Sequence, residues 1–271
     1  MHSRPSASDL TLRSQQLAQL VSATGDVIKI DDAERVLGIS RVDASKLLSR
    51  WKKQGWVRRV GPGAYVAASL DSLTSEHVLE DPWVLVPALF EPAYIGGRSA
   101  TEYWDLTEQI FNDTMVMTAA KIRQRNQIRH NNKFSLKHID PKRIFGTKTI
   151  WRGQSRIAIS DVHRTIVDIL DDPAIGGGIQ HVEDCLKAYL RREDSDTKQL
   201  IKYGDRLNNG ALFKRLGFLA ERCGATKSLI AECKKRLTSG NAKLDPALDC
   251  NKLVTPWRLW VPQQWKDQAG Q

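Results

Sequence analysis

The chain has 271 residues, 41% of them hydrophobic and 27% charged, a length and composition that predict two globular domains. Its formal net charge of +10 suits a nucleic-acid partner, although such an average is informative only once the charges are located. No apolar run is long enough to span a membrane and no signal-peptide core is present, so we expect a cytoplasmic protein with no membrane partner.

Residues 1–75 are predicted to form a winged helix-turn-helix. Apolar residues at helical spacing predict a first helix over residues 10–24, a short strand over 27–30 and a second helix that ends at Gly38. A third helix over residues 41–54 begins after Ser40, which resembles a capping box together with Asp43. Two strands, 56–60 and 64–67, then flank a glycine-proline turn at 61–63.

The third predicted helix has an apolar side and a polar side. We expect Val42, Leu47, Leu48 and Trp51 to hold it against the first two helices, with its polar side turned outward. A helix presented in this way fits the DNA major groove, where each base pair shows a distinct pattern of hydrogen-bond donors and acceptors.

Positive charge is concentrated in this helix and the strand after it. From Arg41 to Arg59 seven basic residues stand against Asp43 alone, a net charge of +6. The N-terminal part of such a helix usually reaches the base edges, so Arg41, Ser45 and Lys46 are the predicted readers of sequence. The predicted backbone contacts are Ser49, Arg50 and Lys53 on the helix and Arg58 and Arg59 on the wing.

Two other interpretations of this module were weighed. A basic amphipathic helix can be a solvated surface, and winged helices also serve as protein-docking modules. The one-sided charge, the small side chains between the cations and the matching charge on the wing favour double-stranded DNA over both.

A polar connector at residues 71–81 leads into a second domain, residues 76–271, predicted to be larger and mixed α/β. The domain is expected to open with helices at 83–90 and 99–106. Its strands follow at 114–119, 134–139, 144–151 and 156–159, ahead of most of its helices. Helices follow at 162–170, 179–190, 197–207, 211–221 and 226–237, and then a final strand at 253–261. The predicted class of the whole chain is therefore α+β.

A second basic segment lies in this domain. From Lys121 to Arg156 eleven basic residues stand against Asp140 alone, a net charge of +10. The candidates for a second nucleic-acid surface are Arg123, Arg125, Arg129, Lys133 and Lys137. A solvated sheet face explains the pattern equally well, and the sequence leaves open whether the segment contacts DNA, another partner or solvent.

Several segments resemble the AbiEi family, the antitoxins of type IV (abortive-infection) toxin–antitoxin systems. Residues 25–67 resemble its N-terminal winged helix, through Ile30-Asp-Asp-Ala-Glu-Arg-Val-Leu-Gly-Ile-Ser-Arg and Gly61-Pro-Gly-Ala-Tyr-Val. Pro92-Ala-Tyr-Ile-Gly-Gly-Arg-Ser and Ile159-Ser-Asp-Val-His-Arg-Thr resemble parts of its C-terminal domain. The resemblance implies a repressor of its own operon that binds its own promoter and counteracts a nucleotidyltransferase-like toxin, without a stable complex between the two proteins.

The rival hypothesis is an enzyme, a nuclease or transferase that uses the winged helix for targeting. Asp161 and Asp168, with Lys121 or Lys148 on neighbouring strands, are its candidate residues. At helical spacing, however, Asp168 pairs with Arg164, and Asp161 lies in a first turn where the helix dipole favours an acid. We therefore expect no enzymatic activity and no catalytic residues.

Metal and cofactor sites are not expected either. The four cysteines are far apart in the last third of the chain, and no pair of histidines stands near them at ligand spacing. The three consecutive glycines at 176–178 follow a helix rather than a strand and lack the lysine of a phosphate-binding loop.

Overall fold

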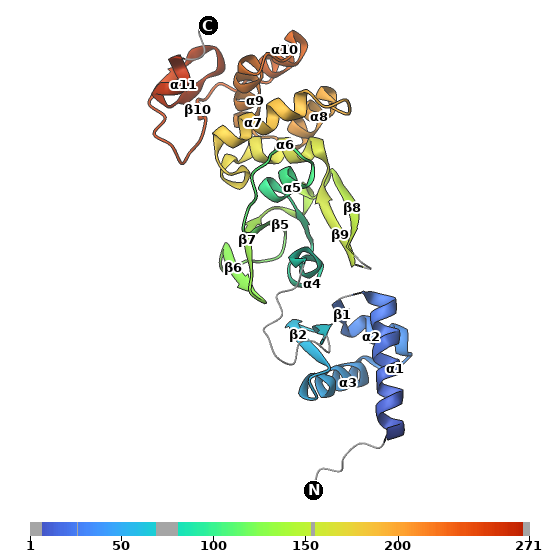
Figure 1. Ribbon diagram of the computed structural model, residues 1–271. Helices are drawn as coiled ribbons and strands as arrows, with labels where there is room; N and C mark the ends of the chain where they lie inside the picture. The colour runs from blue at the N-terminus through green and yellow to red at the C-terminus, as the bar shows by residue number, and fades with distance from the viewer. Residues whose placement is uncertain (1–6, 26, 69–80, 153–154, 268–271) are drawn as a thin grey trace.

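The computed structural model describes residues 7–25, 27–68, 81–152 and 155–267 (Figure 1). Residues 7–68 form a module at one end of the molecule, and residues 81–267 form a larger region. The boundary between the two predicted domains, at residue 75, lies outside the described residues.

The N-terminal module consists of three helices and a three-stranded sheet. Its elements are α1 Ala7–Thr24, β1 Val27–Lys29, α2 Ile30–Leu37, α3 Arg41–Lys53, β2 Val57–Gly61 and β3 Ala64–Ala67. The strands lie in the order β1-β3-β2, with both pairs antiparallel. The three helices and the hairpin predicted from the sequence are therefore present, and β1 joins the hairpin as a third strand.

Local signals in the sequence fix where α3 begins and ends. Gly38 has a φ of +64°, a left-handed conformation that glycine adopts without strain, and ends α2. The Ser40 hydroxyl accepts a hydrogen bond from the Asp43 amide at 3.2 Å and donates one to its carboxylate at 2.7 Å. The Trp56 amide donates to the Trp51 carbonyl at 2.9 Å, so β2 is held to the end of α3.

A small apolar core holds the three helices to one face of this sheet. Trp51, Leu48 and Ala44 of α3 are fully buried in it. The other members of this core are Leu20, Ile28, Ala33, Val57 and Tyr65. α3 therefore packs through residues 44, 48 and 51, which recur at helical spacing.

The larger region is built on a six-stranded mixed sheet. Its strands are β4 Ala93–Ile95, β5 Thr114–Thr118, β6 Asn126–Arg129, β7 Asn132–His138, β8 Thr147–Arg152 and β9 Ser155–Ser160. Their order in the sheet is β6-β7-β5-β4-β9-β8. The β6–β7 and β8–β9 hairpins therefore supply the two edge strands, and they contain most of the second basic segment.

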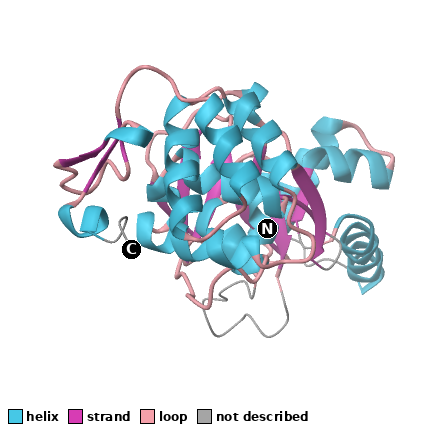
Figure 2. Ribbon diagram, turned by 90° about the horizontal axis from the view of Figure 1, so that it is seen from above, coloured by secondary structure: helices cyan, strands magenta, loops and turns pink. Residues whose placement is uncertain are grey.

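Helices cover this sheet. Those of the larger region are η2 Pro82–Leu85, α4 Val86–Leu89, α5 Gly97–Tyr103, η3 Pro141–Arg143, α6 Val162–Asp171, η4 Pro173–Gly176, α7 Ile179–Leu190, α8 Thr197–Leu207, α9 Gly210–Arg222 and α10 Lys227–Lys235. Figure 2 shows helices lying over the strands of the sheet. The predicted α+β class, with the main helices after the strands, is confirmed.

The C-terminal segment forms a small sheet beside the helices. Its elements are β10 Ala242–Lys243, β11 Lys252–Val254, η5 Thr255–Trp257, β12 Leu259–Val261 and α11 Gln263–Asp267. The single strand predicted over residues 253–261 is wrong, because η5 divides this segment into two strands that pair antiparallel. Among the described residues no helix is both long and apolar enough to cross a membrane.

The module and the larger region share an apolar core. Its members include Val27, Val60, Ala64 and Val66 from the module and Val84, Leu85, Val86 and Phe90 from η2, α4 and the turn after it. One face of the module's sheet thus packs on the three helices, and the opposite face packs on the larger region. Lys29 adds an ion pair with Glu91 at 3.0 Å across this junction.

Candidate nucleic-acid interface

The outer face of α3 is a stripe opposite the buried one. Residues 42, 45, 46, 49 and 53 recur at intervals of three and four, so their side chains lie along one side of the helix. This stripe includes Val42, whose side chain is 62% exposed. The expectation that Val42 packs inward is wrong, because the helical repeat places Ala44 at the inward position.

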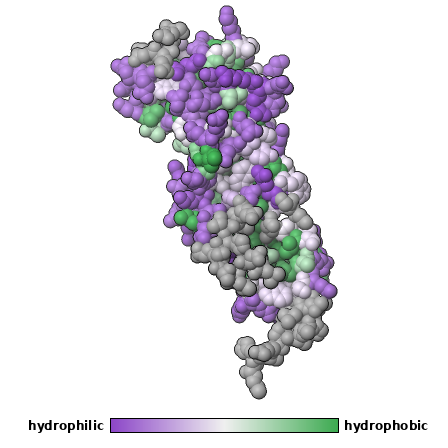
Figure 3. Space-filling view, in the orientation of Figure 1, coloured by the Kyte–Doolittle hydropathy of each residue, from purple (hydrophilic) through white to green (hydrophobic). Residues whose placement is uncertain are grey.

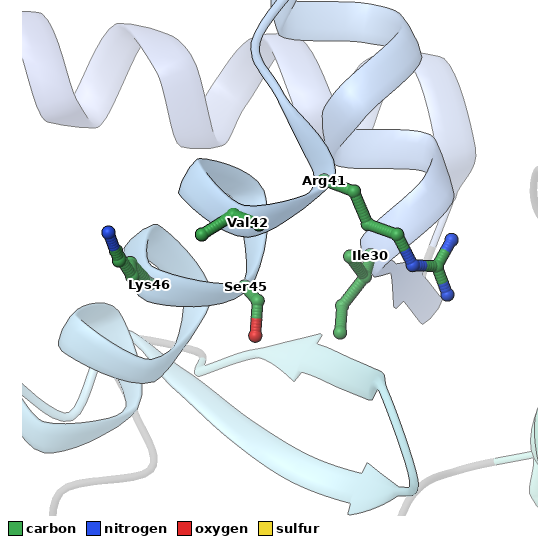
Figure 4. Close-up of a pocket in the computed structure, with 5 residues that line it drawn as sticks. All are labelled: Ile30, Arg41, Val42, Ser45 and Lys46. Atoms are coloured by element: carbon green, nitrogen blue, oxygen red, sulfur yellow. The ribbon is translucent and has the colours of Figure 1, made fainter.

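Five residues line a shallow pocket on this face (Figure 4): Ile30 at the start of α2, and Arg41, Val42, Ser45 and Lys46 on α3. Arg41 and Lys46 extend to opposite sides, with Ser45 and Ile30 between them. Cationic donors, a hydroxyl and apolar groups together match what base edges offer, since thymine presents a methyl group beside its acceptor. All three predicted base readers line this pocket.

Sequence reasoning missed Ile30 and Val42 at this pocket. A count of apolar positions at a period of 3.6 residues separates Val42 from Leu48 and Trp51 and would have placed it outside. No signal in the sequence indicates Ile30, because its approach to α3 depends on how α2 and α3 cross.

The predicted reader Arg41 has an acidic neighbour. Its guanidinium forms an ion pair with Asp31 of α2, and the two side chains are 65% and 68% exposed. Such a pair contributes little to stability because both groups remain solvated. It does, however, neutralise one cation at the entrance to the pocket.

Replacing Asp31 with alanine is expected to strengthen DNA binding, because Arg41 would lose its competitor for a phosphate or a base edge. We expect the slope of log affinity against log salt concentration to steepen by about 0.9, the contribution of one additional phosphate contact. Titrations of labelled duplex at several salt concentrations measure this slope. The matched variant Asp43→Ala instead removes an acid in the first turn of α3, whose carboxylate accepts a hydrogen bond from the capping Ser40 hydroxyl, and it should lower the thermal midpoint. Weaker binding by Asp31→Ala would show that Arg41 needs Asp31 for its orientation.

The remaining α3 cations are unpaired within the part of the chain that the structure describes. Lys46, Arg50 and Lys53 are exposed, as is Ser49. Lys52, which the sequence analysis did not assign, is also exposed in the last turn. Cations in a last turn also complement the helix dipole, so Arg50, Lys52 and Lys53 have a structural benefit in addition to their charge.

The β2–β3 hairpin places the two predicted wing arginines at an edge of the module's sheet. Arg58 and Arg59 are both exposed on β2, an edge strand, and Arg59 Nε donates to the Gly61 carbonyl at 3.0 Å. The turn itself is partly covered by α4, because a Cβ added to Gly61 would lie 2.9 Å from Leu89 Cδ2. The arginines are accessible, whereas the start of the turn is packed against the larger region.

The residues of the second predicted surface separate into two groups. Arg123, Arg125, Arg129 and Lys133 are exposed on the β6–β7 hairpin and the loop before it. Lys137, in contrast, forms an ion pair with Asp172, and its side chain is only 25% exposed. Lys137 is therefore engaged within the protein.

Most of the other cations in the second basic segment also have partners. Arg143 pairs with Asp171 at 2.7 Å, and Arg152 pairs with Asp81 at 3.2 Å. Lys148 lies 5.2 Å from the ring centroid of Trp104, and Arg156 lies 5.9 Å from that of Trp151. Among the described residues, the unpaired charge of this segment is therefore concentrated on the β6–β7 hairpin and the loop before it.

The two carboxylates of the enzymatic hypothesis have structural roles. Asp161 caps α6, accepting from the Arg164 amide at 2.7 Å, and also accepts from the Tyr203 hydroxyl at 2.7 Å. Asp168 is 2% exposed and accepts from Arg164 Nε and the Tyr94 hydroxyl, each at 2.9 Å. These contacts disfavour a nuclease site at Asp161 and Asp168. The described residues contain no group of three or more side chains suited to a metal ion.

The chain is similar to known proteins in two ways. Residues 15–68 match a protein family described as "Transcriptional regulator, AbiEi antitoxin". The chain also resembles the crystal structure of the RV2827C protein from Mycobacterium tuberculosis, with 14% sequence identity, a TM-score of 0.57 and 91% of each chain covered. At this identity the second likeness concerns the fold alone. No curated protein matches the chain significantly.

Proposed function

We propose that this chain, whose residues 15–68 match the AbiEi antitoxin family of transcriptional regulators, is a DNA-binding regulatory antitoxin with a winged helix-turn-helix as its reading module. The observation that carries the proposal is the outer stripe of α3. It combines small side chains with the exposed cations Lys46 and Lys53, which have no partner among the described residues, and the opposite side of the helix is buried in a core.

α3 would enter the major groove of double-stranded DNA. Arg41, Ser45 and Lys46 lie at its N-terminal end, where they would contact base edges, and Val42 beside them suits a thymine methyl group. The backbone contacts would come from Ser49, Arg50 and Lys53, and from Arg58 and Arg59 of β2. Phosphate contacts would hold the helix in register, while the pocket residues would select the sequence.

The target of this binding is proposed to be the promoter of the chain's own operon, so that the protein represses its own synthesis in the cytoplasm. As an antitoxin it would counteract a nucleotidyltransferase-like toxin encoded beside it, without a stable complex. The support for both statements is the family match of residues 15–68 and the sequence resemblance beyond them. We propose no enzymatic activity, since Asp161 and Asp168 are occupied by Arg164, Tyr94 and Tyr203.

The proposal is tested in cells with the full-length variant Lys46→Ala/Arg50→Ala. A reporter fused to the chain's own upstream region should lose repression, because two cations of the reading helix are removed without touching the core. In the same strains, growth in the presence of the toxin encoded beside the chain measures how well each variant neutralises that toxin. Repression by the variant equal to that by the parent would overturn the assignment of α3.

This test requires the full-length chain rather than the isolated N-terminal module. Val60, Ala64 and Val66 of the module are buried against the larger region, so a truncated module would expose an apolar face. Loss of binding by such a fragment would report on folding as much as on DNA contacts.

A further inference from the structure

Two apolar side chains from different helices line the shallow pocket on the outer face of α3. Val42 lies in the first turn of α3, and Ile30 is the first residue of α2. The cations Arg41 and Lys46 line the same pocket and extend to opposite sides of it (Figure 4). The part of the reading face between the two cations is therefore partly apolar.

The exposure of Val42 serves neither the core nor the helix. Its side chain is 62% exposed, and a β-branched residue slightly lowers helix propensity. Figure 3 shows a mainly hydrophilic surface, and Val42 is one of five large hydrophobic side chains that are exposed among the described residues. A single exposed apolar residue is ordinary on a protein surface. One that shares a pocket with a second apolar residue, between two cations, indicates a partner with an apolar group of its own.

Ile30 is held in place by the wing. Its amide donates to the Gly63 carbonyl at 3.0 Å, and a Cβ added to Gly63 would lie 3.4 Å from Ile30 Cδ1. The Ile30 side chain thus packs against the turn of the wing, yet it is only partly buried and also lines the pocket. The fold therefore sets the position of this apolar group before any ligand arrives.

A hydroxyl lies in the same pocket. Ser45 follows Val42 by three residues, so the two side chains lie on one side of α3. Figure 4 shows Ser45 Oγ pointing away from α3 toward the wing, as Ile30 does. The Ser45 hydroxyl has no hydrogen-bond partner among the described residues, so it is available to a ligand.

This combination of groups matches one base edge in particular. Thymine is the unmodified base that presents a methyl group in the major groove, at C5, and its O4 acceptor lies next to that methyl group. Cytosine lacks the methyl group and presents an amino donor in place of the O4 acceptor. An apolar wall beside an available hydroxyl therefore fits thymine better than any of the other three bases.

We propose that Val42 and Ile30 form a binding site for the C5-methyl group of one thymine, with the Ser45 hydroxyl donating to O4 of the same base. This inference rests on the proposed function, and it adds the base and the chemical group that this part of α3 recognises. The site contributes sequence preference without salt dependence, because no charge is involved. Since 5-methylcytosine carries the same methyl group, binding also responds to methylation of a cytosine at that position.

The experiment replaces the thymines of a duplex from the chain's own upstream region, one at a time, with deoxyuridine, which lacks only the C5-methyl group. Full-length parent, Val42→Ala and Lys46→Ala are titrated with this set and with an unrelated duplex of equal length. Lys46→Ala is the matched control, because it changes the same pocket and leaves both apolar side chains in place. Circular dichroism checks the fold.

We expect a thymine at which uracil weakens binding by the parent about fourfold, the change that corresponds to the burial of one methyl group. In Val42→Ala the same replacement should weaken binding less than about twofold, since half of the apolar wall is gone. Lys46→Ala should bind every duplex more weakly and keep the fourfold difference. Val42→Thr keeps the branched shape of the side chain and should reduce the difference in the same way if Val42→Ala disturbs the fold.

A second comparison uses modified cytosine at the thymine identified in this way. Replacing that A·T pair with G·C should weaken binding by the parent. Methylation of the new cytosine at C5 should then recover about fourfold of the loss in the parent, and less in Val42→Ala.

A parent that binds every uracil duplex like the unmodified one would overturn the inference while leaving the assignment of the α3 cations intact. An equal uracil effect in the parent and Val42→Ala would also overturn it, because another side chain would then contact the methyl group. A parent without preference for its own duplex over the unrelated one would reject the proposed function, and this inference with it.

Discussion

Replacing Trp51 with alanine is expected to lower the free energy of unfolding by about 3–5 kcal/mol, the usual cost of removing a large buried aromatic side chain. Trp51 is fully buried in the core that joins α3 to the rest of the module, and its ring stacks on Trp56 with centroids 6.4 Å apart. It determines which side of α3 faces outward. Thermal or denaturant unfolding of the full chain measures the loss.

Two matched variants make this prediction specific. Trp51→Phe should cost less than Trp51→Ala, since it keeps an aromatic ring and removes an indole N–H that is buried without a hydrogen-bond partner among the described residues. Ser45→Ala, on the outer face of the same helix, should leave stability nearly unchanged and alter sequence preference. Equal thermal midpoints for Trp51→Ala and the parent would mean that α3 is rotated relative to the structure described here.

The second large effect is expected at Asp168. Replacing it with alanine should lower the free energy of unfolding by about 3–5 kcal/mol, because the buried charge of Arg164 loses its partner. The Arg164 and Asp168 side chains are 1% and 3% exposed, and they are joined by a 2.9 Å ion pair. The Arg164 guanidinium also lies 3.9 Å from the ring centroid of Phe145, while its Nη1 has no hydrogen-bond partner among the described residues. Removal of Asp168 would therefore leave Arg164 with little compensation.

Tyr94 completes this buried network. Burial raises the pKa of its phenol well above the usual value, and the negative charge of Asp168 raises it further. The phenol therefore stays protonated and donates to Asp168 at 2.9 Å. Tyr94→Phe removes this hydrogen bond and the one that Arg164 Nη2 donates to the hydroxyl at 3.1 Å, and it should lower the free energy of unfolding by about 1–3 kcal/mol.

A double replacement distinguishes the contribution of the ion pair from the cost of leaving one buried charge unpaired. Arg164→Met/Asp168→Leu removes both charges and should be less destabilising than Asp168→Ala, because no unpaired charge remains. Chemical denaturation of the single and double variants provides the comparison. A double variant less stable than Asp168→Ala would show that the pair contributes net stability. If Asp168→Ala were as stable as the parent, the carboxylate would have no structural role, and the enzymatic hypothesis would regain a candidate residue.

Much of the fold could be predicted because local signals act within a few residues. α7 and α8 begin and end at the predicted residues, since the helical periodicity of both, and the Asp196 cap of α8, lie in the segments themselves. Val42 was misplaced because its hydrophobicity was weighed above its position in the helical repeat. β6, with the sequence Asn-Gln-Ile-Arg, was missed because its pairing with β7 comes from a partner strand rather than from its own propensity.

The candidate interface was predictable only in part, because some of its contacts join elements that are far apart in the sequence. The cations of α3 are close in sequence, so their grouping follows from one helix. The sequence does not show that Lys137 pairs with Asp172, that Arg41 pairs with Asp31, or that His130 contacts Val60. Each of these contacts joins residues on different elements, and the order of strands in the sheet decides which of them meet.

The central claim, that α3 reads DNA, is tested most directly by binding of purified full-length protein to a duplex from its own upstream region. The parent is compared with Lys46→Ala/Arg50→Ala across a range of salt concentrations, with circular dichroism of both. We predict unchanged spectra, weaker binding by the variant, and a salt slope lower by about 0.9 for each phosphate contact removed. Unchanged affinity and slope in a correctly folded variant would contradict the account.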